Sequence, residues 1–383
     1  MYNNGNCKIF GGLVRESNMT VAVDLSFIRP DHTNGGTESC IKNLIRGWIK
    51  NGVIKDFIFF IHEDIYDDYG MLFPECRFIQ YQSKFSHKVR TTWFQTFELP
   101  HLINQYKVDV LYYPTYTTGY YLKLKIPVIV NPHDIQFKFF PEYFSRLKRL
   151  YLDFGYSHSL KRANKIIAIS NYVKGTLQQY YGKQCGNKII TVYDPVDFEY
   201  RDAQAPSGIK SPYILSVSSI QKHKNMITLV KAFEHICNRI PHQLVIVGCK
   251  GNGMESILDY LREKNLSDRI RFTDYVKSEE INWLYTNASL YVTTSLYEGF
   301  GMTPIEAMGR GIPTISSKAT SLPEVTLNQA IYYEPGNDDR ILAEKILEVL
   351  MSEVKSVNMS DIINRYDKST IAAQLYKVFE EVL

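Results

Sequence analysis

Two α/β domains, each with a parallel sheet covered by helices, are the fold that this sequence predicts. Its 383 residues suit two domains of the usual size, roughly 100–200 residues each. Short apolar, β-branched runs alternate with helix-length segments whose apolar residues recur every three or four positions. The alternation occurs twice, and a polar stretch containing two prolines separates the two sets. These observations predict a doubly wound, Rossmann-like sheet in each half.

The expected strands are runs that are apolar on both faces, as in a sheet covered by helices on both sides. The first set lies at residues 20–25, 57–61, 109–113, 127–130 and 165–169. The second set lies at residues 213–217, 244–248, 270–274, 290–294 and 312–316. Residues 225–240 give the clearest helical pattern between strands.

The polar stretch 198–212 is interpreted as a linker between a first domain, residues 1–200, and a second, residues 205–364. Residues 365–383 predict an amphipathic helix with no strand after it, which is able to pack back on the first domain. Two such domains facing each other would form a deep cleft between the carboxyl ends of their sheets. Open α/β sheets bind ligands at those ends.

Composition excludes several classes of function. A net charge of +4, from 44 basic and 40 acidic residues, is too balanced for a nucleic-acid partner of the arginine-rich type. The sequence shows no signal-peptide pattern, and no apolar run approaches the roughly 20 residues of a membrane span, so a cytoplasmic location is expected. The cysteines are predicted to be reduced, mostly buried thiols without a zinc site, at positions Cys7, Cys40, Cys76, Cys185, Cys237 and Cys249.

The stretch "SLYEGFGMTPIEAMGRG", residues 295–311, places Glu298 and Glu306 around a Gly-Phe-Gly turn after an expected strand. One interpretation is purely structural. Thr303 can be the N-cap of a helix, with Pro304 at its first position and Glu306 closing a capping box.

The glycines of this turn favour a binding interpretation. Gly299 and Gly301 imply either a positive φ or a close approach of another chain segment. Backbone N–H groups beside a helix start attract phosphate. Carboxylates there would instead accept hydrogen bonds from hydroxyl groups. A ligand with hydroxyls on both sides of a phosphate is a sugar nucleotide.

The same stretch resembles the E-x7-E motif of the retaining GT-B glycosyltransferases of family 4. The resemblance continues in order through both expected domains, in segments 33–45, 126–144, 165–177, 213–233 and 321–325. The chain is most similar to the bacterial polysaccharide and O-antigen group, which includes many mannosyltransferases. The resemblance therefore implies a GT-B fold, with two Rossmann-like domains facing across a cleft.

The resemblance implies roles for the motif. Glu298 would lie near the donor sugar, Glu306 would bind the ribose hydroxyls, and Lys224 would hold the diphosphate. Without the family, Lys224 would be an ordinary surface lysine and Glu298 a solvated loop acid. The backbone that would meet sugar and phosphate oxygens belongs to Gly299, Phe300, Gly301 and Met302.

One departure from the family concerns positive charge. Many members carry an arginine five or six residues before the diphosphate lysine, where this chain has Ser218 and Ser219. Lys222 or His223 could supply the missing positive charge at the diphosphate, and Arg310 and Lys318 are weaker candidates.

Two further loops match the first domain of the family. Gly35 and Gly36 match a glycine-rich loop whose amides lie near the diphosphate or the acceptor, although a plain turn is the simpler interpretation. His133 matches the histidine placed against the donor sugar, and Asp134 is a candidate to orient it. The alternative is an ordinary loop histidine followed by a helix-capping aspartate.

The resemblance implies transfer of a hexose from a nucleotide sugar to an acceptor hydroxyl, with retention of anomeric configuration. Mannose from GDP-mannose is favoured, and a UDP- or dTDP-sugar is the alternative. No D-x-D triplet occurs, so neither a metal nor another cofactor is expected. Glu298 is not assigned as a nucleophile, because positioning and diphosphate stabilisation would carry catalysis.

The acceptor of this family is often a lipid-linked sugar. Residues 137–156 are predicted to be helical and to combine Lys148 and Arg149 with an apolar face of Tyr143, Phe144, Leu147, Leu150, Tyr151 and Phe154. That face either packs on the sheet, which is the simpler interpretation, or makes peripheral contact with the inner membrane surface.

Rival functions are weaker. A nucleotide-sugar epimerase would need no acceptor, and a phosphorylase should be longer and carry a pyridoxal lysine. A non-catalytic binding subunit would fit the missing arginine but not the intact Glu298, Glu306 and His133. A Rossmann oxidoreductase is disfavoured because residues 248–253 do not form a G-x-G-x-x-G loop.

Overall fold

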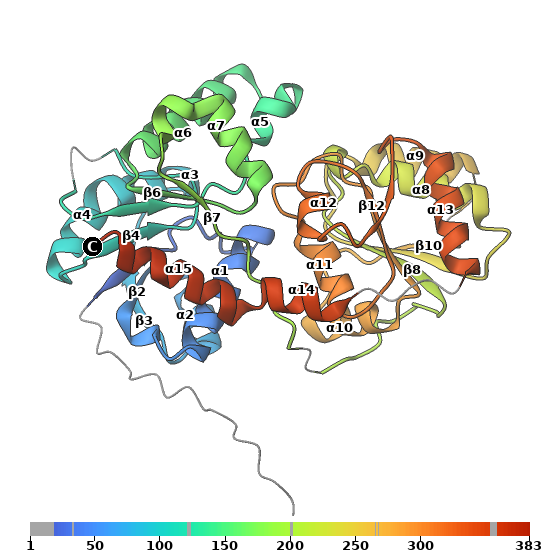
Figure 1. Ribbon diagram of the computed structural model, residues 1–383, viewed down its shortest axis with the longest axis horizontal. Helices are drawn as coiled ribbons and strands as arrows, with labels where there is room; N and C mark the ends of the chain where they lie inside the picture. The colour runs from blue at the N-terminus through green and yellow to red at the C-terminus, as the bar shows by residue number, and fades with distance from the viewer. Residues whose placement is uncertain are drawn as a thin grey trace, which may run out of the picture.

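The protein folds into two α/β domains that lie side by side (Figure 1). In each domain, all strand pairs within the sheet are parallel. The computed structural model describes residues 19–32, 34–120, 124–199, 202–264, 266, 268–352 and 358–383.

The first domain holds a seven-stranded sheet in the order β3-β2-β1-β4-β5-β6-β7. Its strands are β1 Val21–Asp24, β2 Phe57–His62, β3 Arg77–Tyr81, β4 Val110–Tyr113, β5 Val128–Val130, β6 Lys165–Ala168 and β7 Ile189–Thr191. Its helices are α1 Gly36–Lys50, α2 Glu63–Leu72, α3 His87–Trp93, α4 Leu99–Gln105, α5 Gln136–Phe139, α6 Arg146–Arg162 and α7 Asn171–Cys185, with short helices η1 Ile54–Asp56, η2 Phe94–Glu98 and η3 Pro141–Tyr143.

The second domain holds a six-stranded sheet in the order β10-β9-β8-β11-β12-β13. Its strands are β8 Tyr213–Val217, β9 Gln243–Val247, β10 Ile270–Phe272, β11 Leu290–Thr293, β12 Thr314–Ser317 and β13 Ile331–Tyr333. Its helices are α8 Met226–Ile236, α9 Met254–Lys264, α10 Ser278–Asn287, α11 Met302–Met308, α12 Leu322–Val325 and α13 Asp339–Met351, with the short η4 Lys222–Lys224.

The two faces of the first sheet carry separate hydrophobic cores. Successive residues of a strand point to opposite faces, so Ala22 and Phe60 join one core while Val23 and Phe59 join the other. All four are fully buried. This is the burial pattern that the uninterrupted apolar runs of the sequence predict, and the ten expected strands are confirmed to within two residues at each end.

Three strands were not predicted, namely β3, β7 and β13. All three lie at an edge of their sheet, and only part of each is buried. An edge strand has one neighbour and less helix cover, so its sequence need not be apolar throughout.

The polypeptide returns to the first domain through helices α14 (Met359–Tyr366) and α15 (Lys368–Glu381), drawn in red in Figure 1. Helix α15 packs along α1, where the Trp48 indole N–H donates a hydrogen bond of 3.2 Å to the Ala372 carbonyl. The buried ammonium of Lys368 pairs with Asp197 at 2.5 Å and with Glu199 at 3.2 Å. Residues far apart in sequence thereby complete one core of the first domain.

Helix α6 differs from its predicted form. It begins at Arg146 rather than near residue 137, because α5 and η3 occupy the preceding residues. The interpretation that its apolar face packs on the sheet is wrong for Leu147, Leu150, Tyr151 and Phe154, whose exposed fractions are 81%, 67%, 53% and 59%. Within the described residues, no helix combines the length and apolarity that crossing a bilayer requires.

The cysteines within the described residues form no disulfide, in line with reduced thiols. Cys40, Cys185 and Cys237 are buried as predicted, but Cys249 is exposed, so that part of the prediction is wrong. Cys249 lies in the loop after β9, where the chain has left the sheet. Cys7 lies outside the described residues.

Candidate active site

The turn between β11 and α11 has the backbone geometry that its glycines predict. Gly301 has a φ of 102°, a conformation that L side chains rarely adopt. Gly299 permits a close approach, because a Cβ there would lie 2.4 Å from the His133 carbonyl oxygen. The turn of the second domain therefore touches the loop after β5 of the first domain.

The helix-capping interpretation of this stretch is wrong. Helix α11 begins at Met302 with Gly301 at its N-cap position, so it starts before Thr303. The Thr303 hydroxyl instead accepts a hydrogen bond of 2.8 Å from Tyr291. Because Gly301 at positive φ already turns the chain, no side-chain cap forms, and Glu306 is not used at the helix start.

Glu306 lies inside the second domain. Its Oε2 accepts a hydrogen bond of 2.8 Å from the Tyr285 hydroxyl. The guanidinium of Arg310 lies 4.6 Å from the centroid of the same tyrosine ring. Burial raises the pKa of Glu306 above its usual value, and the Tyr285 hydrogen bond and the Arg310 charge partly offset this rise.

The structure brings Lys224 and Glu298 together. The Lys224 Nζ lies 2.6 Å from Glu298 Oε1, which also accepts a 2.7 Å hydrogen bond from the Ser295 hydroxyl. Lys224 is the last residue of η4, and Thr294 fixes its backbone by donating to its carbonyl oxygen at 2.8 Å. Both charged side chains are mostly buried, with exposed fractions of 17% and 14%.

His133 follows β5, and its carbonyl oxygen lies close to Gly299. Its Nε2 is 3.1 Å from the Pro114 carbonyl, and because a carbonyl can only accept, Nε2 carries the proton. Asp134 does not orient this histidine. Its carboxylate accepts a hydrogen bond from the Gln136 amide at 2.9 Å, so it stabilises the loop in which it lies.

The acid beside His133 is Asp194, which sequence reasoning missed. Its Oδ2 lies 3.8 Å from His133 Nδ1, and its Oδ1 accepts a 3.2 Å hydrogen bond from the Cys40 thiol. Burial raises the pKa of the Asp194 carboxyl. Asp194 follows β7, one of the unpredicted edge strands, so its place at the carboxyl edge of the sheet could not be seen in the sequence.

Gly35 and Gly36 open helix α1, the helix that also carries Cys40. Gly35 occupies the N-cap position with a φ of 58°, so a glycine is required there. A Cβ on either glycine would meet no atom within 4 Å. The start of α1 therefore leaves its backbone open to approach. Its connection to His133 runs through Cys40 and Asp194 rather than through a direct contact.

The backbone between Gly299 and Met302 is buried or partly buried. Among the described residues, no atom accepts a hydrogen bond from the N–H groups of residues 299–302. The Phe300 side chain is buried between the rings of Tyr193 and Tyr366. Phe300 could therefore offer a ligand only its backbone.

His223 is not the cation that replaces the missing arginine. Burial, followed by the neighbouring Lys224 charge, lowers the pKa of His223 to about 4, so its imidazole is neutral at pH 7. Lys222 is exposed, and its amide is held by Asn252 at 2.8 Å. Of these neighbours, only Lys224 presents a mostly buried positive charge beside the turn.

The two remaining candidates for that charge have other contacts. Arg310 donates a 2.9 Å hydrogen bond to the Glu306 carbonyl and lies against Tyr285. Lys318 pairs at 3.3 Å with Glu334 on an exposed surface. These contacts favour neither residue as a ligand of the diphosphate.

Glu324 fixes the turn against the first domain, a role that the sequence did not reveal. Its two carboxylate oxygens accept from the amides of Asn171 at 2.7 Å and Tyr172 at 3.0 Å, at the start of α7. Beside them, the Ser170 hydroxyl donates to the Gly299 carbonyl at 2.7 Å. An acid of the second domain thus caps a helix of the first.

Neither motif glutamate belongs to a metal-binding group. Within the part of the chain that the structure describes, the one group of three suitable side chains is His62, Glu63 and Asp64 at the start of α2. His62 Nδ1 accepts from the Asp64 amide at 3.1 Å, and Asp64 pairs with Arg90 at 2.6 Å. These two contacts already stabilise the start of α2.

Two protein-family models match adjoining parts of this chain. The model described as Glycosyltransferase Family 4 matches residues 34–200. The model described as Glycosyl transferases group 1 matches residues 199–367. Together they cover both domains in the order expected from the sequence resemblance.

Among curated relatives, O-antigen chain mannosyltransferase RfbU of Salmonella typhimurium is 28% identical over 66% of this chain and 69% of the relative. O-antigen chain mannosyltransferase B of Escherichia coli is 25% identical over 58% of this chain and 60% of the relative. The GDP-Man:Man(3)GlcNAc(2)-PP-Dol alpha-1,2-mannosyltransferase of Dictyostelium discoideum is 22% identical over 57% and 48%. The matched segments thus span between about half and two thirds of these relatives.

Two solved structures share the fold over nearly the whole chain. Sucrose-phosphate synthase from Thermosynechococcus elongatus superposes with a TM-score of 0.76 and 18% identity, covering 95% of this chain and 98% of that one. HepE of Anabaena, in complex with UDP and glucose, has a TM-score of 0.69 and 17% identity, covering 95% and 100%. The expected GT-B architecture is thereby confirmed.

Proposed function

Because the chain belongs to the family 4 glycosyltransferases, we propose that it transfers a hexose from a nucleotide sugar to a hydroxyl of a growing surface polysaccharide. The observation that carries this proposal is the Lys224–Glu298 pair at 2.6 Å, beside the amides of residues 299–302, which have no partner among the described residues. A diphosphate needs a cation and N–H donors, and a sugar needs a carboxylate acceptor. Glu298 directly precedes these amides in the chain, and Lys224 reaches it from the short helix η4.

The proposed donor position uses each predicted residue. The diphosphate would lie against Lys224 and the turn amides, and an ammonium with three N–H donors can hold Glu298 and a phosphate together. Glu298 precedes Gly299 and the His133 carbonyl lies close to it, so these two residues would bound the sugar. Glu306 would accept from the ribose hydroxyls, and the open start of α1 at Gly35 and Gly36 would approach the diphosphate or the acceptor.

The proposed step retains the anomeric configuration. The bond between the anomeric carbon and the diphosphate oxygen breaks, and the acceptor oxygen forms its bond on the same face. The acceptor proton passes to the departing diphosphate. Lys224 stabilises the negative charge that develops on the leaving group, so no carboxylate nucleophile and no metal ion are assigned.

GDP-mannose is the proposed donor. Two relatives are O-antigen mannosyltransferases, and the Dictyostelium relative pairs GDP-Man with a PP-Dol acceptor in its name. The alternative is a UDP- or dTDP-sugar, and the complex of HepE with UDP and glucose supports the uridine form.

A lipid-linked acceptor and a cytoplasmic protein in peripheral contact with the inner membrane belong to the same proposal. Four large apolar side chains of α6 are exposed on one surface. Exposed basic residues, Arg146 and Lys148, lie within the same two turns. This combination suits the interface of an anionic bilayer.

A thermal-shift panel tests the donor. GDP, UDP, dTDP and their sugars would each be added to the purified full chain. A cognate ligand at 100 times its Kd should stabilise the protein by about 2.7 kcal/mol, and we expect GDP-mannose to give the largest shift. Stabilisation by none of these ligands would overturn the proposed function.

Two further readouts separate the rivals. Release of GDP that depends on an added acceptor identifies a transferase, whereas conversion of the nucleotide sugar without acceptor identifies an epimerase. Binding without either reaction identifies a non-catalytic subunit. The anomeric carbon–proton coupling of the product, measured by NMR, distinguishes retention from inversion.

A further inference from the structure

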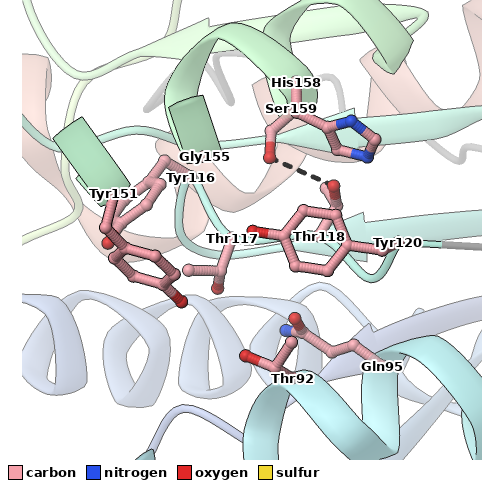
Figure 2. A pocket seen from close by; sticks show the side chains of 10 residues that line it. All are labelled: Thr92, Gln95, Tyr116, Thr117, Thr118, Tyr120, Tyr151, Gly155, His158 and Ser159. Atoms are coloured by element: carbon pink, nitrogen blue, oxygen red, sulfur yellow. Dashed lines mark hydrogen bonds between the residues drawn. The ribbon is translucent and has the colours of Figure 1, made fainter. Parts of the chain in front are cut away.

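The loop between β1 and α1 ends at Gly35 and leads into Gly36. Near its start, Gln95, which is drawn in Figure 2, donates a 2.6 Å hydrogen bond to the Asp24 carboxylate at the end of β1. The same carboxylate accepts a hydrogen bond from the Ser26 amide at 2.9 Å. The beginning of this loop is therefore fixed by contacts within the first domain.

Asn34 holds the second half of the β1–α1 loop against the first half. Its Oδ1 accepts a hydrogen bond from the Arg29 amide at 2.8 Å, and its Nδ2 donates to the Phe27 carbonyl at 3.1 Å. Because an amide side chain carries no titratable proton, these two contacts do not change with pH.

His32 lies in the same loop in a left-handed backbone conformation. Its φ is 52°, a value that residues other than glycine adopt uncommonly and at a cost in free energy. Such a conformation persists only when surrounding contacts hold it. The charged residues beside it in the loop, Arg29 and Asp31, are exposed to solvent. The contacts that hold His32 are made by its own imidazole ring.

The imidazole of His32 lies between carboxylates of two helices. Its Nδ1 is 2.7 Å from Glu38 Oε1 in the first turn of α1, and its Nε2 is 3.2 Å from Asp68 Oδ2 of α2. A carboxylate can only accept a hydrogen bond, and a neutral imidazole has a single N–H group. Both contacts are therefore satisfied only when the ring is a doubly protonated imidazolium.

The neighbouring charges favour the same protonation state. The hydrogen bond to Glu38 raises the pKa of His32 above its usual value, burial partly offsets this rise, and the hydrogen bond to Asp68 adds to it. The Lys42 ammonium, 2.7 Å from the same Glu38 oxygen, acts against the rise without reversing it. The Tyr69 hydroxyl also donates to this oxygen, at 3.4 Å.

Loss of the His32 proton would change the support of the loop. One ring nitrogen would then present a lone pair to a carboxylate, so that contact would become repulsive. The left-handed conformation at His32 would lose one of its two supports. Gly35 lies three residues further along the chain, where a Cβ would meet no atom within 4 Å. A change at His32 can therefore reach the start of α1.

We propose that His32 is a positioning residue whose imidazolium holds the β1–α1 loop, and with it Gly35 and Gly36, in the conformation that transfer requires. The inference rests on the proposed function, in which this loop approaches the diphosphate or the acceptor. It deepens that function by giving transfer a pH-dependent contact outside the donor site. His32 acts through the loop and does not touch the substrate.

The direction of the pH dependence follows from linkage. A histidine whose pKa is raised in the folded state stabilises that state fully below its unfolded-state pKa of about 6.5. The contribution is lost as pH rises through the raised folded-state pKa. The loop should therefore be held at neutral and mildly acidic pH and released on the alkaline side.

An NMR titration of the full chain, labelled with ¹⁵N at histidine and glycine, tests the contact without a substrate. The His32 ring and the amides of Gly35 and Gly36 should shift with one common midpoint above about pH 6.5. In Asp68→Asn the common midpoint should fall by roughly half a pH unit, a small shift because Asp68 is exposed and its charge is screened by water.

The matched control is His235→Gln. It removes another histidine that pairs with an aspartate, because His235 Nε2 lies 2.6 Å from Asp339 Oδ2 in the second domain. This variant should leave the midpoint of the Gly35 and Gly36 amides unchanged.

Kinetics give the second arm, with GDP-mannose as donor and soluble α-linked mannotriose as acceptor. Wild-type kcat/KM should fall by roughly threefold to tenfold across the His32 midpoint, as loss of one hydrogen bond would cause. Asp68→Asn should move this fall to lower pH by the same amount as in the NMR titration, and His235→Gln should not move it. His32→Gln should have the low value throughout and show no fall at this midpoint.

The inference is overturned if the Gly35 and Gly36 amides do not follow the His32 ring, or if Asp68→Asn leaves the fall in kcat/KM at the wild-type pH. Because Asp68 is exposed, its variant keeps the test decisive even where His32→Gln fails to fold. Failure of the proposed function has a different signature. No nucleotide sugar would then stabilise the wild type, whereas the common titration of His32 and the two glycines would remain.

Discussion

At the scale of single residues, the pairing of Lys224 with Glu298 explains why two distant charges are found in one place. Each side chain is mostly buried, and an isolated buried charge is strongly unfavourable. The contact neutralises both, and Ser295 adds a third polar partner. Under the proposed function, the pair offers a cation to the diphosphate and an acid to the sugar without leaving an uncompensated buried charge.

Replacing Lys224 tests this pair. Lys224→Gln should weaken donor binding about 10–100-fold, because a hydrogen bond to a charged group contributes about 1.5–3 kcal/mol. Calorimetric titration with the nucleotide sugar measures the effect. Lys222→Gln is the control, since it removes an exposed positive charge two residues away. Equal donor affinity of the two variants would contradict the assignment of Lys224.

Glu306 gives a pH dependence. Its raised pKa means that its carboxylate protonates at a higher pH than an ordinary glutamate, near 4.3. As pH falls through this raised pKa, the carboxylate ceases to be a pure acceptor for the ribose hydroxyls, so donor affinity should fall. In Glu306→Gln, donor affinity should be lower at neutral pH and flat across the acid range.

The same group has an opposite effect on stability. A carboxyl with a raised pKa in the folded state stabilises the fold below its unfolded-state pKa, and this contribution is lost as pH rises through the folded-state pKa. Glu306→Gln should therefore raise Tm at neutral pH, where the wild type holds a partly buried negative charge. An unchanged Tm together with unchanged pH dependence of binding would show that Glu306 is not the ribose acceptor.

Metal removal provides a further prediction at this scale. If Lys224 and the turn amides supply the charge that a divalent ion would otherwise provide, transfer should continue in excess EDTA. Initial rates would be measured with added Mg²⁺ and with a tenfold excess of chelator over that Mg²⁺. The two rates should agree within about twofold, which corresponds to a negligible change in the activation free energy. A complete loss of rate that Mg²⁺ restores would contradict this mechanism.

The sequence predicts part of this site and misses part for physical reasons. Gly299 and Gly301 are predictable because a close approach and a positive φ both demand glycine. Asp194 is hidden because it follows a half-exposed edge strand. The role of Glu324 is hidden because it caps a helix in the other domain, and no local pattern records such a contact.

At the scale of elements, partial exposure is common to the three missed strands, although the edge strand β10 was predicted despite an exposed residue. Central strands carry one long apolar signal because both of their faces are covered. The edge strand β3 has exposed and half-exposed residues at four of its five positions, so its sequence resembles a loop. Helix α6 is the converse case, because its apolar face follows the pattern of a core helix and yet lies at the surface.

Helix α6 yields a prediction about membrane contact. The double variant Leu147→Ser/Leu150→Ser should lower the fraction that floats with anionic phosphatidylglycerol vesicles at least fivefold, because two exposed leucines would lose a favourable burial of roughly 1.5–3 kcal/mol each. Lys148→Glu should act in the same direction and more strongly at low salt.

The control for this experiment is Leu258→Ser, which removes an exposed leucine of the second domain. Arg149 is not used, because it is only partly exposed and its Nε is buried without a partner among the described residues, so that its reversal would disturb the fold. Unchanged flotation of the α6 variants would contradict peripheral docking through this helix.

At the scale of the whole molecule, the packing of α15 on α1 joins distant parts of the chain. The close approach depends on Gly47, because a Cβ at this position would lie only 2.3 Å from the Lys368 carbonyl oxygen and 2.5 Å from the Ala372 Cβ. Glu199, held by Lys50 and Lys368, has its pKa lowered to about 2 by these two lysines. The interface therefore combines close backbone packing with ion pairs.

Gly47→Ala tests the importance of this interface. The added methyl collides with backbone and should destabilise the protein by about 1–3 kcal/mol, as overpacking does, with a matching fall in Tm. Gly175→Ala is the control, because it also lies within a helix and its Cβ would meet nothing within 4 Å. That variant should be neutral or stabilising by up to about 1 kcal/mol. Similar Tm values for the two variants would show that α15 does not pack tightly in solution.

The position of α15 has a consequence for biosynthesis. The lobe that is translated first lacks one layer of its interior until residues 368–381 have left the ribosome. Its sheet can form earlier, but the apolar surface around Trp48 stays exposed to solvent while the entire second lobe is synthesised. Nascent chains stalled before residue 368 should therefore be strong clients of ribosome-associated chaperones. Chains extended by a C-terminal linker, so that residue 383 has left the ribosome, should be released by them.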